Sequence, residues 1–232
     1  MPSEELMERV RTLRGQGRSP KEIARALRLS PATVAPLVRA IAAEEKRDAP
    51  EPVIAGCWVS PGWASGLTVH DRSTWPGIDK PGDPGQSGLV TVLVARGRGG
   101  SKVSACGYLI DVYCLGVKNV FGPRTIDRRK LPELVHQYFA SYDAPPLAAP
   151  VELARHLVFG AIAYARDLGF EPAAGFQAGA GHLGPWEGPS AIGFGRDGKP
   201  LFIQGPYDNA AGVMKTLERS TGHGNFGFLV VA

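Results

Sequence analysis

The stretch Ser19-Pro-Lys-Glu-Ile-Ala-Arg-Ala-Leu-Arg-Leu-Ser-Pro-Ala-Thr-Val34 contains the same helix-start signal twice. In each copy a serine precedes a proline, at Ser19-Pro20 and at Ser30-Pro31. Serine caps the amino terminus of a helix, and proline is favoured at the first helical position because its missing N–H has no partner there anyway. The pattern therefore predicts two short helices separated by a tight turn at Arg28-Leu29.

Apolar residues recur at helical spacing through this part of the chain and predict a small buried core. An earlier helix, with Ser3 as its cap and Gly15–Gly17 at its end, completes a three-helix unit within residues 1–45. The predicted inward positions are Met7, Val10 and Leu13 on the first helix, Ile23, Ala24 and Leu27 on the second, and Val34, Leu37, Val38 and Ile41 on the third.

The second and third helices resemble the helix-turn-helix of bacterial DNA-binding regulators and of sigma-factor-like domains. The shared features are Ile23-Ala24, a small residue at the helix crossing, and Ser30-x-x-Thr-Val34 at the start of the recognition helix. The resemblance implies DNA binding through the major groove. Two positions depart from the pattern. Arg28 stands at a turn position often held by glycine, and Pro36 falls inside the third helix, where it removes a backbone hydrogen bond.

Basic residues are concentrated in the same part of the chain. From Arg9 to Arg39 there are eight basic residues and one acid, Glu22, whereas residues 51–232 hold sixteen basic and fifteen acidic residues. A compact basic block favours a polyanionic partner. Direct base reading needs side chains such as arginine, and Arg39 is the one such side chain on the outward face of the third helix, so we expect phosphate contacts to dominate. The predicted nucleic-acid-binding residues are Arg18, Lys21, Arg25, Arg28, Thr33 and Arg39.

A charged, proline-containing segment predicts a linker at residues 46–52, followed by a second domain over residues 53–232. Its pattern predicts the α+β class, with a mixed or antiparallel sheet and packed helices. The predicted strands are 53–60, 89–95, 102–112 with a continuation to 118, 191–195 paired with 201–204 as a hairpin, and 226–231. The predicted helices are 132–142, 151–168 and 209–220. In the long loop at 60–88, Trp63 and Trp75 either pin the loop to the core or form a lid or contact surface.

Three segments of this second domain, 109–118, 164–170 and 198–208, resemble a family of uncharacterised bacterial proteins. The resemblance implies a shared fold over most of residues 53–232. It assigns no activity to the domain.

Several polar residues of the second domain are candidates for chemistry. Asp111 lies between apolar residues on a predicted strand, Asp208 follows a strand, and Glu152 and His156 are one turn apart on a helix. If Asp111, Asp208 and Glu152 cluster, they have the ligand chemistry to hold Mg²⁺ for phosphodiester cleavage. Alternatively, Asp111 pairs with Lys118 or with Arg155, and Asp208 caps the last helix.

Other enzyme signatures are weaker or missing in the sequence. A Cys114 nucleophile with His156 as its base is one alternative, although a cysteine in an apolar strand usually belongs to the core. The five histidines show no metal-ligand spacing, and no Walker or dinucleotide motif is present, so we expect no metal and no cofactor. The three cysteines show no paired spacing, and no long apolar run suggests a membrane span, which together favour the cytoplasm.

These patterns lead to one hypothesis and two alternatives. The hypothesis is a cytoplasmic DNA-binding protein that regulates transcription, with a second domain that dimerises, senses a ligand or recruits a protein partner. The first alternative is a metal-dependent nuclease or other hydrolase that uses Asp111 and Asp208. The second alternative is an adaptor that binds RNA, the ribosome or RNA polymerase.

Overall fold

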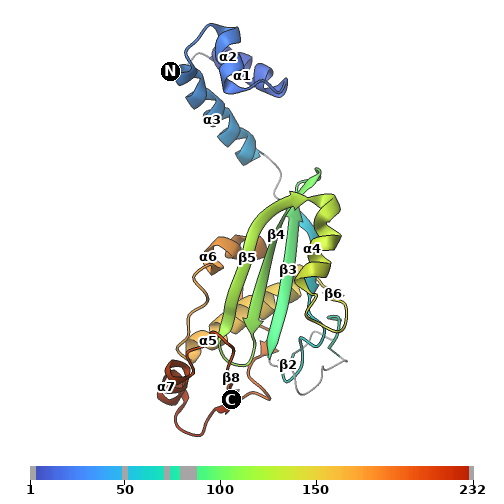
Figure 1. The fold of residues 1–232 in the computed structure, drawn as a ribbon, viewed down its shortest axis with the longest axis vertical. Coiled ribbons are helices and arrows are strands. Elements are labelled where there is room, and N and C mark those ends of the chain that lie inside the picture. Colours follow the sequence, from blue (N-terminus) through green and yellow to red (C-terminus); the bar gives the residue numbers. More distant parts are fainter. Residues whose placement is uncertain (1–3, 49–51, 71–73, 79–87, 230–232) are drawn as a thin grey trace. The chain divides into compact units, whose positions relative to one another are not determined.

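The computed structural model describes residues 4–48, 52–70, 74–78 and 88–229. The chain forms two compact units, Met1–Glu51 and Pro52–Ala232 (Figure 1). The first unit is helical, and the second is built on a five-stranded antiparallel sheet with packed helices. The predicted α+β class is therefore confirmed.

The first unit consists of three helices, α1 (Glu4–Gly15), α2 (Pro20–Leu27) and α3 (Pro31–Asp48). Its buried core lies at positions that the helical spacing predicts, namely Val10, Ile23, Ala24, Val34, Leu37 and Ile41. The predicted cap Ser3 lies outside the described residues. α3 continues through Pro36 and ends at Asp48, three residues into the predicted linker at 46–52, and the boundary between the two units also falls within that segment. The apolar face of α3, which is buried at residues 34, 37 and 41, offsets the hydrogen bond that the proline removes.

Two predicted helix starts in this unit are confirmed. At α2, Ser19 Oγ accepts the Glu22 N–H at 3.4 Å, and the Glu22 carboxylate accepts the Ser19 N–H at 2.8 Å, which is a reciprocal capping box. At α3, Ser30 Oγ accepts the Thr33 N–H at 3.1 Å. Between the two helices, Arg28 adopts the left-handed conformation with φ 54°. This explains why glycine is often found at such a turn position.

The second unit contains a sheet with the strand order β5-β4-β3-β1-β6. Its members are β1 (Val53–Val59), β3 (Leu89–Gly97), β4 (Lys102–Asp111), β5 (Gly116–Asp127) and β6 (Leu147–Ala148). All of its pairings are antiparallel. Two small sheets accompany it, one of β2 (Thr68–Val69) with β7 (Ile192–Gly193), and one of β8 (Leu201–Ile203) with β9 (Gly227–Leu229).

Helices cover both faces of the five-stranded sheet (Figure 1). On one face, Val92 and Val94 of β3 pack with the buried side of α5 (Val151–Asp167). On the other face, Leu93 and Ala95 pack with α4 (Leu131–Tyr138), which follows a short 3₁₀ helix, η1 (Arg128–Lys130). Since successive side chains of a strand point to opposite faces, burial on both faces explains the apolar run Val92–Ala95 of β3.

Trp63 and Trp75 belong to the main core, and Trp63 Nε1 donates to the Pro76 carbonyl at 2.8 Å. The loop tryptophans therefore pin this segment to the core, as one of the two sequence interpretations proposed. The acidic residues of the same loop, at 71, 79 and 83, lie outside the described residues.

Three predictions of secondary structure in this unit are wrong. β4 does not continue to residue 118 but ends at Asp111, and the chain turns over residues 112–115 into β5. The strands near 192 and 201 do not pair as a hairpin, because β7 pairs with β2 and β8 pairs with β9, leaving only one bridge between Arg196 and Lys199. Helix α6 (Phe176–Leu183) was not predicted, since its sequence contains two glycines.

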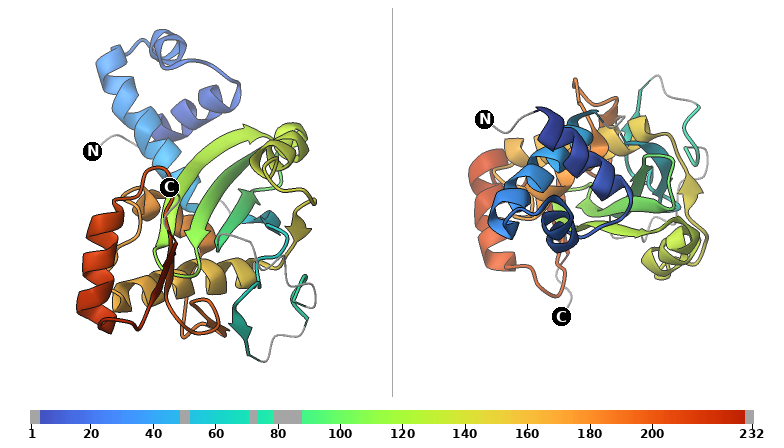
Figure 2. Two further views of the ribbon diagram at one scale, coloured as in Figure 1. Left: turned by 60° about the horizontal axis from the view of Figure 1, so that its bottom comes forward. Right: turned by 90° about the horizontal axis from the view of Figure 1, so that it is seen from above.

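Helix α7 (Ala210–Thr221) stands beside the carboxyl end of α5 (Figure 2). A separate small core joins these elements through Cys114, Leu168, Phe202 and Leu217. This core anchors α7 to the turn that connects β4 with β5. No helix among the described residues has both the length and the apolar character that a membrane crossing requires.

Candidate functional site

The predicted nucleic-acid-binding residues all lie on the exposed surface of the first unit. Arg18 precedes α2, Lys21 and Arg25 lie on α2, and Arg28 is the residue at the turn. Thr33 and Arg39, on α3, are exposed as well. These six residues of the basic block are thus exposed, whereas the Ile23–Ile41 core is buried.

The one acid inside this basic block is tied to the helix cap. The Glu22 carboxylate accepts hydrogen bonds from the Ser19 backbone N–H and from the Ser19 hydroxyl at 2.7 Å. These hydrogen bonds, together with the charges of Arg18 and Arg25, lower the pKa of Glu22. Glu22 therefore stays ionised at neutral pH, but its carboxylate is occupied by the cap.

The outward side of α3 offers few groups that read bases. Ala32 and Pro36 are exposed and apolar, and the Thr33 hydroxyl lies 2.8 Å from the Ser30 hydroxyl. Bidentate reading of a base edge needs an arginine, lysine, asparagine or glutamine side chain. The chemistry of this face therefore suits the sugar–phosphate backbone better than the base edges.

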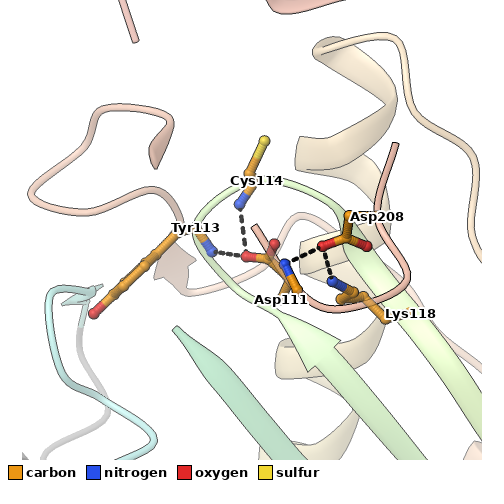
Figure 3. Close-up of polar contacts among 6 residues, drawn as sticks. Asp111, Tyr113, Cys114, Lys118 and Asp208 are labelled. Atoms are coloured by element: carbon orange, nitrogen blue, oxygen red, sulfur yellow. Dashed lines mark hydrogen bonds and ion pairs between the residues drawn. The ribbon is translucent and has the colours of Figure 1, made fainter. Parts of the chain in front are cut away.

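In the second unit, Asp111 and Asp208 lie in the same region, beside the turn between β4 and β5, and each has its own hydrogen-bond partners (Figure 3). The buried Asp111 carboxylate accepts the backbone N–H groups of Tyr113 and Cys114, at 2.9 and 3.0 Å. Burial raises the pKa of Asp111 to about 6, against the lowering effect of these hydrogen bonds and of the Lys118 charge. Asp111 is the side chain that turns β4 back into β5, which explains why the predicted strand ends here.

Asp208 is held by a lysine that lies ninety positions earlier in the chain. Lys118 Nζ donates to Asp208 Oδ2 at 2.6 Å, and the Gly205 N–H donates to the same oxygen at 2.8 Å (Figure 3). Asp208 does not cap α7, because Asn209 is the cap and its side chain accepts the Gly212 N–H. Lys118, a predicted partner of Asp111, donates its hydrogen bond to Asp208 instead and acts on the Asp111 carboxyl through its charge.

The structure separates Glu152 from these two aspartates. Gly116, which begins β5, packs against Ala161 and Ala165 of α5. Glu152 is nine residues earlier on the same helix than Ala161, which is about 13 Å along the helix axis. A single Mg²⁺ ion needs its ligands at about 2 Å, so the three carboxylates do not form the predicted cluster. Among the residues that the structure describes, no group of three acidic, histidine or cysteine side chains is arranged for a metal ion.

His156 is held among aromatic rings at the start of α5. Its ring centroid lies 5.0 Å from that of Trp75 and 4.9 Å from that of Trp186. Nδ1 accepts the Ala191 N–H at 2.9 Å, which places the proton of the neutral ring on Nε2, and Nε2 lies 3.8 Å from Glu152 Oε1. These contacts give His156 a structural role between α5 and the segment that precedes β7.

The Cys114–His156 pairing is not formed. Cys114 lies in the small core beside α7, whereas His156 packs against Trp75 of the main core. Burial also raises the pKa of the Cys114 thiol. Because the thiolate is the reactive form, a buried protonated thiol suits packing rather than nucleophilic attack.

Arg155, the other predicted partner of Asp111, forms its hydrogen bond with α6 instead. Its Nε donates to the Leu183 carbonyl at 2.7 Å, at the end of α6. That contact and the Tyr108 hydroxyl, which donates to the Gly179 carbonyl at 2.7 Å, fix α6 against the sheet. Both contacts join distant segments, and the sequence gives no local signal for them.

No protein-family model, curated protein or solved structure matches this chain. The chemistry of the residues described above therefore carries the functional argument.

Proposed function

We propose that α1–α3 form a helix-turn-helix module that binds duplex DNA mainly through its phosphates, and that the protein regulates transcription. The single observation that carries this proposal is that the basic side chains of α2, α3 and the adjoining turns are exposed while the apolar side chains of these helices are buried. Ile23, Ala24 and Val34 are buried, while Arg18, Lys21, Arg25, Arg28 and Arg39 are exposed. These five exposed cations, with Arg9 and Arg11 of α1 exposed as well, match a partner with closely spaced negative charges.

The turn between α2 and α3 supports the same proposal. The left-handed conformation of Arg28 allows α3 to begin three residues later, at Pro31, with Ser30 as its cap. Arg28 is thereby exposed between the two helices, next to the exposed start of α3. In helix-turn-helix proteins the first residues of the second helix approach the DNA, and neighbouring cations bind the flanking phosphates.

The test is charge reversal on α2 and at the turn that follows it, in the full chain. Arg25→Glu together with Arg28→Glu should weaken binding to a fluorescent duplex by a factor of about one hundred or more, because two phosphate contacts are replaced by repulsion. The matched control is Lys215→Glu with Arg219→Glu, which makes the same charge change on the exposed side of α7. Equal affinities for the two double variants would contradict the proposal.

The apolar outward face of α3 favours a second candidate, an adaptor that binds RNA. Ala32 and Pro36 are exposed where a DNA regulator usually carries base-reading side chains. Competition between duplex DNA and structured RNA for the labelled protein separates the two. The DNA proposal predicts that duplex DNA competes better at equal phosphate concentration, and the reverse order would favour the adaptor.

A further inference from the structure

The nearly neutral charge of the second unit conceals a strong asymmetry. Two segments of seven residues, 96–102 and 124–130, hold seven basic residues and one acid, Asp127. The rest of residues 51–232 holds nine basic and fourteen acidic residues. One part of this unit is therefore strongly positive, and the remainder is negative.

The sheet register brings these two segments together. β4 and β5 pair with Lys102 opposite Asp127 and with Ala105 opposite Arg124. The Arg128 N–H donates to the Ser101 carbonyl at 2.7 Å, which joins the start of η1 to the β3–β4 hairpin. A side chain added at Gly97 would lie 2.9 Å from Arg128 Nη2, so the guanidinium lies against the hairpin backbone. The two segments thus form one surface at one end of the sheet (Figure 1).

The cations of this surface, which we call the basic sheet end, are exposed. Arg96 is the exception, because it turns inward and donates to the His182 and Pro52 carbonyls. Asp127, the acid, accepts the Arg129 N–H and the Arg129 Nε, so it caps η1. The exposed cations are Arg98, Lys102, Arg124, Arg128, Arg129 and Lys130.

The hairpin tip at this end is open to a ligand. Gly99 and Gly100 have no atom within 4 Å of the position that a side chain would take. The space beside these two glycines is therefore open, and Arg98 and Lys102 flank the tip. A projecting two-stranded ribbon with flanking cations has dimensions that fit a nucleic-acid groove.

We propose that the basic sheet end binds the phosphate backbone of nucleic acid. The alternative partner is an acidic protein surface, but protein interfaces have an apolar or aromatic centre. Among the described residues, neither segment itself contributes an exposed large apolar side chain, and the exposed apolar side chains paired with this end of β3 are Val53 and Ile54 of β1, opposite Gly97 and Arg96. Six exposed cations with one occupied acid instead match a backbone that carries a charge every 1.7 Å or so along the duplex axis. This inference stands on the second unit alone and does not rest on the function proposed for α1–α3.

The test is a salt titration of duplex binding by the full chain, measured by fluorescence anisotropy. The variant is Arg98→Glu with Lys130→Glu, and the matched control is Lys215→Glu with Arg219→Glu. Since each lost phosphate contact lowers the slope of log K against log salt by about one, we expect the slope to fall by about two and the affinity to fall about tenfold. Arg98→Gln with Lys130→Gln, which removes charge without reversing it, should give a smaller loss in the same direction.

The outcomes separate this inference from the function proposed for α1–α3. If the Arg98→Glu, Lys130→Glu variant binds like the control with an unchanged slope, the inference is overturned, whatever Arg25→Glu with Arg28→Glu does. If only the sheet-end variant loses binding, the inference is supported and the α1–α3 proposal fails. Competition by poly-glutamate as strong as that by DNA at equal charge would assign the surface to an acidic protein and overturn the inference.

Discussion

The basic surface of α1–α3 and the basic sheet end carry comparable charge but are assembled in different ways. The first comes from one continuous stretch, Arg9 to Arg39, and is visible in a simple count along the chain. The second comes from two segments that only the pairing of β4 with β5 brings together. The net charge of residues 51–232 is close to zero because acidic residues elsewhere in this range balance the cations of the basic sheet end. A near-neutral net charge therefore does not exclude a strongly basic surface.

The hydrophobic cores of the two units also differ in how far apart their residues lie along the chain. The core of α1–α3 joins residues within about thirty positions of one another. The main core of the second unit joins positions from Cys57 to Phe194, and its small core extends to Leu217. Each unit has its own buried core, so we expect each to unfold in its own step. The following predictions test this comparison, in order of decreasing effect.

The largest effect is expected from Ile23→Asp, since Ile23 has no exposed area. A carboxylate in this small apolar core costs several kcal/mol, which is comparable with the whole stability of such a unit. Hydrogen exchange should show loss of protection throughout α1–α3 and unchanged protection of β3 and β4. The control is Ala26→Asp, at an exposed position of α2. Loss of protection in β3 and β4 as well would contradict the prediction that each unit unfolds in its own step.

The next effect concerns Asp111 and pH. The ordinary pKa of its carboxyl is 3.8, and burial raises the pKa to about 6 in the folded state. At a pH below 3.8, the Asp111 carboxyl is protonated in both the folded and the unfolded state. As pH rises from about 4 through 6, the unfolded state releases its proton first, so the second unit loses up to about 3 kcal/mol of stability.

The variant Asp111→Asn checks this pH effect. Its amide oxygen still accepts the Tyr113 and Cys114 N–H groups, but it does not ionise. Urea unfolding followed in the second unit at about pH 4 and pH 7.5 should show wild type losing stability relative to Asp111→Asn at the higher pH. A constant difference between the two proteins over this range would contradict the role assigned to burial of this carboxyl.

A smaller effect is expected at the ion pair of Lys118 and Asp208, whose side chains are 20% and 12% exposed. Lys118→Met leaves the Asp208 carboxylate without its cation, and we expect a loss of about 2 kcal/mol in the second unit. Adding Asp208→Asn to Lys118→Met should restore part of that loss, because no unpaired charge remains. A double-mutant cycle with no coupling energy would show that the pair does not stabilise the fold.

The smallest effect is expected from Ser19→Ala, which removes the α2 cap. Loss of a serine cap costs about 1 kcal/mol, and the change should appear only in the unfolding step of α1–α3. The exposed Gln16→Ala is the control. An equal shift in both variants would mean that the capping box does not stabilise α2.

The parts of the fold that the sequence predicted are those that depend on local interactions. The caps at Ser19 and Ser30, the turn at Arg28 and the apolar faces of α2 and α3 all follow from residues a few positions apart. These features can be predicted from the sequence because the residues that form each cap or turn lie within one helical turn of one another.

The errors arose where distant segments decide the outcome. β4 ends because the Asp111 side chain takes two backbone N–H groups, whereas the apolar pattern around it continues. β7 and β8 pair with β2 and β9, so the Asp197-Gly198 pair between them, which is a common hairpin-turn sequence, does not join a hairpin here. Asp208 has a partner ninety positions away, which no local pattern reveals.

The basic sheet end depends both on local sequence and on contacts between distant segments. Arg128, Arg129 and Lys130 are consecutive, and that run is a signal the sequence offers. Its juxtaposition with Arg98 and Lys102 depends on the register of β4 and β5 and on the hydrogen bond between Arg128 and Ser101. The charges are visible in the sequence, but the surface that they form is not.

The central claim is that the chain holds DNA by its phosphates, and the most direct measurement is the salt dependence of wild-type binding to duplexes of unrelated sequence. With the five exposed cations at Arg18, Lys21, Arg25, Arg28 and Arg39 as phosphate contacts, we expect similar affinities for all duplexes and a slope of log K against log salt of about −4 or steeper between about 50 and 200 mM salt. Binding that does not change with salt, or no binding to any duplex at the lowest salt, would contradict the account.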